Sequence, residues 1–162
     1  MITAYIGVGS NIERRKHIQA AIKELGMLGK ELRLSTVFEC EAVDFESHAF
    51  YNLVVEMKTS LDLAEFARQL RLIELKWGRA ANAGKYEPRT IDLDIILFGD
   101  HVSETKPELP RSDIYKYAFV LQPLLELCPS RVIPLDGRSV EQIWQQSQFD
   151  TALLPVPLWF NQ

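Results

Sequence analysis

The hydrophobic pattern of this chain changes between a period of two residues and a period of 3.6 residues in a fixed order, and this order restricts the fold more than any other feature. Residues 2–8 form a short β-prone segment, and the residues after it place apolar side chains at the i, i+3, i+4, i+7 spacing of an amphipathic helix. Two strands are expected at residues 32–39 and 50–58, around a loop. A helix at residues 60–77 and a strand at residues 90–98 complete a β-α-β-β-α-β order.

This order predicts an α+β fold with a ferredoxin-like, or split βαβ, core. More helix is expected in part of residues 114–127 and at residues 139–146, so the core gains a C-terminal helical extension and becomes a three-layer αβα sandwich. Residues 153–160 contain two prolines and indicate an irregular tail or an edge strand. No repeat or linker divides the chain, so we expect a single domain over residues 1–162.

Flanking residues indicate where the two helices of the core begin and end. We expect Asp62 to cap the helix at residues 60–77, and Gly78 follows the last apolar residue of that helix. Ser10 or Asn11 can cap the first helix in the same way.

The charge balance argues against a nucleic-acid partner. The chain has 18 basic and 22 acidic residues, a net charge of −4, whereas phosphate-dominated binding favours a basic surface. No apolar run is long enough for a membrane span and the N-terminus shows no secretory signal, so we expect a cytoplasmic protein without a membrane partner. Cys40 and Cys128 have no ligand spacing and fit reduced, unpaired thiols.

Two carboxylates stand out in the expected strand at residues 90–98. A period of two residues places Asp92 and Asp94 on the same face, roughly 6.5 to 7 Å apart along the strand. Mg²⁺ prefers such hard oxygen ligands together with substrate phosphates, and the spacing allows two ions. The alternative is an exposed edge strand with solvated acids. The opposite face is expected to hold four apolar residues: Ile91, Leu93, Ile95 and Leu97.

The loop that leads into this strand is cationic. Arg79 and Arg89 bracket the loop and Lys85 lies within it, next to the acidic pair in sequence. Guanidinium groups bind phosphate oxygens in a fork, so the loop and the aspartates together favour a metal complex of a nucleotide such as ATP. The alternative is an ion pair between Arg89 and one of the aspartates.

The glycines near the N-terminus do not indicate a known nucleotide motif. The sequence GVGSN at residues 7–11 does not continue as a dinucleotide fingerprint, and a tight strand-to-helix turn explains its glycines. There is no GxxxxGK[ST] motif either, so ATP is not expected in a P-loop. The three histidines, His17, His48 and His101, lack metal-ligand spacing and fit surface roles without catalysis.

Aromatic residues offer a place for a planar heterocycle. Phe50, Tyr51 and Phe119 can form a flat apolar slot, and Asn52 can supply an amide. The alternative is that these are ordinary core residues.

The most specific motif in the chain is EPRTIDLDIILFG at residues 87–99. Together with several other segments, it resembles the 6-hydroxymethyl-7,8-dihydropterin pyrophosphokinase family of the folate pathway. The resemblance covers about residues 1–145 and also includes YIGVGSN (5–11), FYNL (50–53), IELKWGR (73–79) and FVLQPL (119–124).

The resemblance implies an enzyme that binds MgATP and then the pterin, and transfers diphosphate to the pterin hydroxymethyl group, releasing AMP. It implies that Asp92 and Asp94 hold two Mg²⁺ ions and that Arg79 and Arg89 act on the triphosphate, all four as catalytic residues. It places the pterin between Phe50 and Phe119, beside Asn52 and Val43. The remaining ATP-binding residues that we expect are Glu74, Lys85, Lys106, Arg111 and Ser112. The protein is expected to be a monomer.

Some positions depart from the family pattern. Arg111 and Ser112 stand where the family usually has histidine and tyrosine, so the positive charge is kept but its geometry is not. Lys85, Arg111 and Lys106 are candidates to replace lost cations. The other departures are Tyr117 and Ala81 for two arginines, Tyr86 for a tryptophan, and CEAV (40–43) for TPPL.

The sequence therefore predicts a magnesium-dependent pterin pyrophosphokinase that works by in-line attack of the substrate hydroxyl on the β-phosphorus, without a compelling general base. A first alternative is a divergent paralogue that binds a pterin or nucleotide and transfers diphosphate weakly or to another alcohol. A second alternative is an RNA-binding module on the same core, which requires stacking aromatics on an exposed sheet face.

Overall fold

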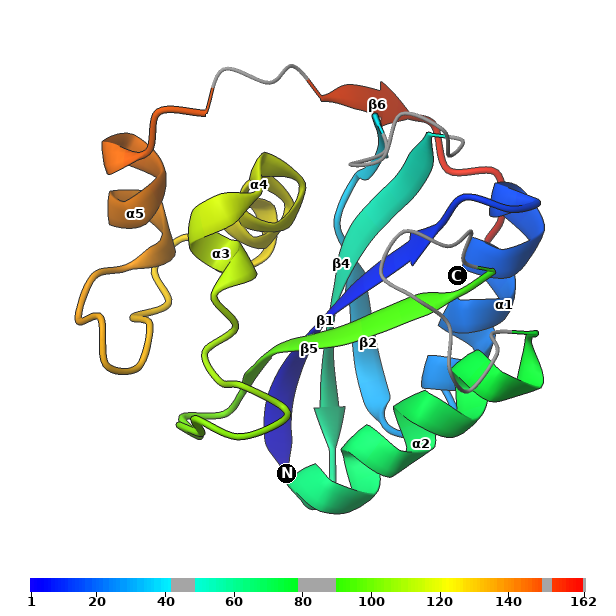
Figure 1. The fold of residues 1–162 in the computed structure, drawn as a ribbon, viewed down its shortest axis with the longest axis horizontal. Coiled ribbons are helices and arrows are strands. Elements are labelled where there is room, and N and C mark those ends of the chain that lie inside the picture. The colour runs from blue at the N-terminus through cyan, green and yellow to red at the C-terminus, as the bar shows by residue number, and fades with distance from the viewer. Residues whose placement is uncertain (42–48, 79–89, 150–152, 162) are drawn as a thin grey trace.

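The computed structural model describes residues 1–41, 49–78, 90–149 and 153–161 (Figure 1). Its helices and strands, in chain order, are β1 (Ile2–Ser10), α1 (Arg14–Leu25), β2 (Lys30–Leu34), β3 (Val37–Cys40), β4 (Phe50–Thr59), α2 (Leu63–Lys76), β5 (Asp92–Phe98), α3 (Asp113–Lys116), α4 (Ala118–Leu127), α5 (Val140–Gln146) and β6 (Leu154–Val156).

The strands form one antiparallel sheet in the order β5-β1-β4-β3-β6, and β2 also pairs with β4. The longest pairing joins β1 to β4, from Ile2 opposite Thr59 to Ser10 opposite Tyr51. The α+β class expected from the sequence is confirmed.

One expected strand is divided in two. The sequence predicts a single strand at residues 32–39, but β2 and β3 are separated by Ser35 and Thr36. The side chain of Ser35 accepts a hydrogen bond from the Val54 backbone, and Thr36 donates from its backbone and its hydroxyl to Glu126 of α4. These side-chain bonds take the chain out of the β ladder at this point, because they satisfy groups that the ladder would otherwise use.

Helices cover both faces of the sheet. Figure 1 shows α1 and α2 on one side and α3, α4 and α5 on the other. Each side has its own hydrophobic core. The first core lies on the side of α1 and α2 and contains Ile18 and Phe66, and the second core lies on the side of α3, α4 and α5 and contains Ile114, Leu121 and Ile143. The expected C-terminal helices therefore cover the face that an RNA-binding module would leave open for stacking.

The apolar side chains of β5 do not keep a strict alternation. Ile95 lies opposite Ile6 of β1, whereas Leu97 lies opposite Tyr5, so Ile96 is an extra residue in β5. Such a bulge turns the following side chains to the other face of the sheet. Ile96 and Leu97 consequently both pack in the second core, and Phe98 packs in the first. The expectation that Leu97 shares a face with Leu93 and Ile95 is wrong for this reason.

The helix caps agree with the sequence at α2 and differ at α1. Asp62 accepts a hydrogen bond from the Glu65 backbone at 2.9 Å, and Gly78 follows the helix with a φ of 103°. Neither Ser10 nor Asn11 caps α1: its N-cap is Glu13, which makes no capping hydrogen bond through its side chain. Ser10 still belongs to β1, and its hydroxyl donates to the Ile12 carbonyl.

The C-terminal segment returns to the sheet. β6 pairs with β3 at the edge of the sheet, which confirms the second of the two expectations for residues 153–160. Trp159 then packs against the Tyr51 ring at 5.7 Å and donates to the Arg15 carbonyl of α1. Within the described part of the chain, no helix has the length and apolar content needed to span a bilayer.

Candidate active site

A hollow lies on the sheet face that α3 and α4 cover, and residues of β1, β4 and β5 form its floor. The polar side chains that line it are Asp92, Asp94, Asn52, Arg111 and Asp113, and Phe119 of α4 lines it as well. The structure thus brings together five of the residues that the sequence predicts for the site, and adds Asp113.

The sheet register explains why the aspartates face Asn52. Gly9 of β1 pairs with Asp92 on one side and with Asn52 on the other, and Gly7 pairs with Asp94 and Val54. A Cβ atom at Gly9 would lie 2.7 Å from Oδ1 of Asn52, so only glycine leaves the Asn52 amide in this place. The expectation that the two glycines form a strand-to-helix turn is wrong, because both lie inside β1.

The surroundings of Asp94 strongly perturb its ionisation. Burial, and secondly the charge of Asp92, raise the pKa of Asp94 to about 7, whereas the nearby charge of Arg111 acts in the opposite direction. The Asp94 carboxylate is thus a costly charge in this position, and a cation is the natural way to compensate it.

The donor set fits magnesium. Asp92 and Asp94 are oxygen donors on one strand face, and Mg²⁺ usually takes one or two carboxylates and completes its shell with water and phosphate oxygens. Within residues 1–41, 49–78, 90–149 and 153–161, no cluster of three or more histidine, cysteine or acidic side chains forms a fuller protein cage. Two carboxylates beside an open space match a metal that arrives with its substrate.

Arg111 reaches this site from the segment before α3. Its Nε donates to Oδ2 of Asp113 at 2.7 Å, and its Nη2 lies 3.6 Å from Oδ1 of Asp94. Sequence reasoning selected Arg111 as a phosphate ligand and missed Asp113. The available signal was the position of an acid two residues after the arginine, at the start of a helix.

Glu74 is buried on α2 and contacts the backbone of β5. Its Oε2 accepts a hydrogen bond from the Leu93 amide at 2.9 Å, between the two aspartates in sequence. Because β5 is an edge strand, this amide donates its hydrogen bond to a side chain instead of to a neighbouring strand. Glu74 thus contacts the strand that carries the carboxylates, and its Oε1 also lies 3.5 Å from Nη1 of Arg71 on the same helix. The contact with the nucleotide that the sequence predicts stays a prediction.

The aromatic residues divide between the two faces of the sheet. Phe50 approaches Gly9 on the same face as Asn52, and Phe119 stacks on Tyr117 with ring centroids 4.9 Å apart. Tyr51 belongs to the opposite core, where the Arg14 guanidinium lies over its ring. Tyr51 is therefore on the opposite face from Asn52, whereas the placement of a ring between Phe50 and Phe119 stays a prediction.

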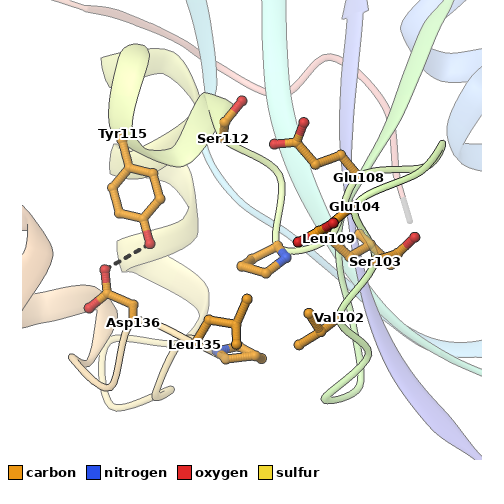
Figure 2. Close-up of a pocket in the computed structure, with 11 residues that line it drawn as sticks. Val102, Ser103, Glu104, Glu108, Leu109, Ser112, Tyr115, Leu135 and Asp136 are labelled. Atoms are coloured by element: carbon orange, nitrogen blue, oxygen red, sulfur yellow. Dashed lines mark hydrogen bonds between the residues drawn. The ribbon is translucent and has the colours of Figure 1, made fainter.

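Other predicted ATP ligands lie away from the aspartates or outside the described residues. Ser112 lines a different hollow, in which Tyr115 donates to Asp136 at 2.7 Å (Figure 2). Lys106 is exposed and does not line the hollow beside β5. Four predicted residues fall outside the described ranges: Val43, Arg79, Lys85 and Arg89.

The histidines and cysteines have structural surroundings. His17 is buried, with Nδ1 2.6 Å from the Ile12 carbonyl and its ring against Trp77, so its expected surface position is wrong. His101 is exposed, and His48 lies outside the described residues. The two cysteines are free and buried, as expected for unpaired thiols.

Residues 5–129 match the family model of 7,8-dihydro-6-hydroxymethylpterin-pyrophosphokinase (HPPK). Two bacterial proteins named 2-amino-4-hydroxy-6-hydroxymethyldihydropteridine pyrophosphokinase are each 37% identical to this chain. The alignment with the protein of Aquifex aeolicus spans 145 residues, 88% of this chain and 90% of the relative. The alignment with the protein of Bacillus subtilis spans 154 residues, with the same two shares.

A solved structure resembles the fold. The crystal structure of Plasmodium falciparum HPPK-DHPS matches 90% of this chain with a TM-score of 0.67 and 13% sequence identity. This chain spans 43% of that longer chain.

Proposed function

The chain belongs to the 7,8-dihydro-6-hydroxymethylpterin-pyrophosphokinase family, and from this premise we propose that the hollow beside β5 is where it brings ATP and the pterin together. The protein is a pyrophosphokinase of folate biosynthesis. Its hollow holds carboxylates on one side and an amide and an aromatic ring on the other, which suits a charged and a planar substrate.

The reaction transfers the terminal diphosphate of ATP to the hydroxymethyl group of 6-hydroxymethyl-7,8-dihydropterin. The hydroxymethyl oxygen attacks the β-phosphorus in line, the bond from that phosphorus to the α-phosphate oxygen breaks, AMP leaves, and the hydroxyl proton is released to water. Phosphoryl-type transfers depend mainly on positioning and on charge stabilisation. The chain therefore acts chiefly by holding the two substrates in line.

Each side of the hollow has a distinct task in this proposal. Asp92 and Asp94 would hold two Mg²⁺ ions, which shield the charge of the triphosphate. Asn52 would bind the edge of the pterin ring, with Phe50 and Phe119 on its two faces and Val43 beside them. The phosphates and the rest of ATP would contact the predicted nucleotide ligands: Glu74, Arg79, Lys85, Arg89, Lys106, Arg111 and Ser112.

The observation that carries the proposal is that a glycine of β1 lies between Asp92 and Asn52 in the sheet. Gly9 separates Asp92 from Asn52 by one strand, and its lack of a Cβ atom lets the Asn52 amide lie over this strand. Strands in a sheet lie about 4.8 Å apart, so the carboxylate and the amide are about two strand spacings from each other. A phosphate group bound near the aspartates and a ring bound at Asn52 would therefore be neighbours across Gly9.

Replacing either aspartate with asparagine tests the proposal. We expect Asp92→Asn and Asp94→Asn to lower the rate of AMP formation from MgATP and 6-hydroxymethyl-7,8-dihydropterin by about 100-fold or more, since each removes a metal ligand. Asp100→Asn is the matched control, because Asp100 is 90% exposed beyond the end of β5. Full activity of both site variants would contradict the proposal.

A second candidate function is supported by one observation. Tyr117, at a position where the family pattern has arginine, stacks on Phe119 instead of offering a charge to phosphate. This contact favours a paralogue that transfers diphosphate weakly or to another alcohol. Steady-state assays with the dihydropterin and with other pterin alcohols distinguish the two candidates, since the paralogue prefers a different acceptor.

We also propose the finer features of the architecture. The strand order β5-β1-β4, with β2 and β3 beside β4, supports a ferredoxin-like core, and the two helical layers support an αβα sandwich. We propose that residues 1–162 are one domain and that the protein is a monomer. The buried free thiols of Cys40 and Cys128 support a reducing compartment, the cytoplasm.

A further inference from the structure

The Arg111 guanidinium lies between two carboxylates at the candidate metal site. Its backbone is fixed, because the Arg111 amide donates to the Ile96 carbonyl of β5 at 3.0 Å. Its side chain then reaches Asp113 on one side and Asp94 on the other. This cation is therefore built into the protein at the position where a metal on Asp94 would bring its own positive charge.

The two contacts of Arg111 are unequal. The 2.7 Å distance from Nε to Asp113 is that of a charge-assisted hydrogen bond, whereas 3.6 Å to Asp94 is too long for one. Arg111 is thus attached to Asp113 and acts on Asp94 only through its charge. A ligand can compete with the second contact more easily than with the first.

The charges around Arg111 favour a ligand that carries both a cation and a phosphate over either of them alone. Asp92, Asp94 and Asp113 line the same hollow as Arg111, and Glu74 lies close enough to act on Asp94 as well. A free divalent cation at Asp94 is repelled by the guanidinium, and a free phosphate is repelled by the carboxylates. A cation that arrives with a phosphate avoids both penalties, because the cation neutralises Asp94 and the phosphate gives the guanidinium a bidentate partner.

We propose that Arg111, positioned by Asp113, is an internal counter-ion of Asp94 that makes the site bind magnesium tightly only together with nucleotide phosphate. This inference rests on the proposed function and goes beyond it, since it assigns the coupling to one ion pair. It also gives the arginine that replaces the family histidine a role of its own. Asp113 is a positioning residue, because it acts through Arg111.

Calorimetric titration of the full, nucleotide-free chain with magnesium chloride tests the counter-ion. We expect Arg111→Gln to lower the Kd for Mg²⁺ at least about tenfold, because the variant loses the cation that repels the metal. Arg111→Lys keeps the charge and should bind Mg²⁺ as weakly as the wild type. Arg68→Gln is the matched control, since Arg68 pairs with Glu65 on the exposed surface of α2.

A second titration uses magnesium with a non-hydrolysable ATP analogue. Here Arg111→Gln and Asp113→Asn should both bind the complex about tenfold more weakly than the wild type. Arg111→Gln lacks the guanidinium that binds the phosphate, and Asp113→Asn lacks the carboxylate that holds this guanidinium in place. Asp113→Asn should not tighten the binding of free Mg²⁺.

The outcomes separate this inference from the proposed function. If the wild type binds the magnesium–analogue complex but Arg111→Gln binds free Mg²⁺ no more tightly than the wild type, the counter-ion inference is overturned. Unchanged binding of the complex by Asp113→Asn removes the positioning role. If the wild type fails to bind the complex at all, the proposed function is overturned.

Discussion

The charge of Asp94 is expected to affect both the stability of the fold and the binding of ligands. Its pKa is raised from the usual 3.8 to about 7, mainly by burial and then by Asp92. The unfolded chain therefore loses the Asp94 proton at a lower pH than the folded chain does. Below pH 3.8 the carboxyl is neutral in both states, and its ionisation weakens the fold as the pH rises towards 7.

We expect Asp94→Asn to be about as stable as the wild type at pH 4 and more stable above pH 7 when metal is chelated. The difference should be about 1 to 2 kcal/mol, well below the full value of the pKa shift, because solvent screens a carboxylate that is 36% exposed. Urea denaturation of both proteins at several pH values measures this difference. An equal stability gap at pH 4 and pH 8 would contradict it.

Gly9 is the residue on which the shape of the hollow depends most directly. A methyl group in Gly9→Ala would displace the Asn52 amide, and we expect the KM for the pterin to rise at least about tenfold, because small misplacements of a substrate-positioning group are costly. Gly7→Ala is the comparison, since its Cβ would meet the flexible end of Ile96 at 3.4 Å. Similar KM values for the two variants would show that the Asn52 position is unimportant.

The sequence alone predicts that the two aspartates share a face, but it does not predict which residues contact them. Asp92 and Asp94 share a face because strand periodicity is local, and the structure keeps them there. Arg111 comes to Asp94 through the backbone bond to Ile96, which depends on how a later segment crosses β5. No local pattern encodes that crossing, so the sequence does not indicate Asp113.

Among the secondary-structure elements, β5 depends on α2 for its outer edge. Glu74 accepts the hydrogen bond of the Leu93 amide, so Glu74→Ala would leave a buried donor without this partner. We expect a loss of about 1 to 3 kcal/mol in the free energy of unfolding. Glu74→Gln keeps an acceptor oxygen and should recover most of the loss.

Two measurements on these variants separate structure from nucleotide contact. Chemical denaturation reports the contribution to β5, and titration with the ATP analogue reports any direct contact with the nucleotide. A variant Glu74→Ala with unchanged stability and weakened nucleotide binding would favour the nucleotide role that the sequence predicts.

The elements themselves were predictable to the extent that they are regular. The helix α2 has an Asp62 cap and a glycine at its end, and both signals are local. The interruption at Ser35 and Thr36 depends on Glu126 of α4, about ninety residues later in the chain. The bulge at Ile96 depends on pairing with β1, which is equally distant in sequence.

In the molecule as a whole, the C-terminal segment closes the edge of the sheet beside β3. Trp159 joins this segment to Tyr51 and to the start of α1, and Arg15 lies over the Trp159 ring. We expect Trp159→Ala to lower the free energy of unfolding by about 1 to 3 kcal/mol, less than a fully buried tryptophan would, because Trp159 is half-buried. Thermal or chemical denaturation measures the loss.

Leu158→Ala serves as the control for this prediction, since Leu158 is 42% exposed beside Trp159. Its effect should be below about 1 kcal/mol. Equal effects of the two substitutions would mean that the tryptophan does not hold the segment. The periodicity of the sequence predicts helices on the sheet. For the C-terminal segment the sequence allows either an irregular tail or an edge strand, because two prolines weaken the strand signal.

The extra residue in β5 also limits how related sequences can vary in length. Before Ile96, one side of the strand is available for carboxylates, whereas Ile96 itself and the following Leu97 and Phe98 are all buried, in two different cores. One amino acid inserted or deleted between Asp94 and Gly99 would turn either the acids or the phenyl ring towards the wrong layer. Homologues should therefore keep this spacing constant and confine gaps in their alignments to the neighbouring loops.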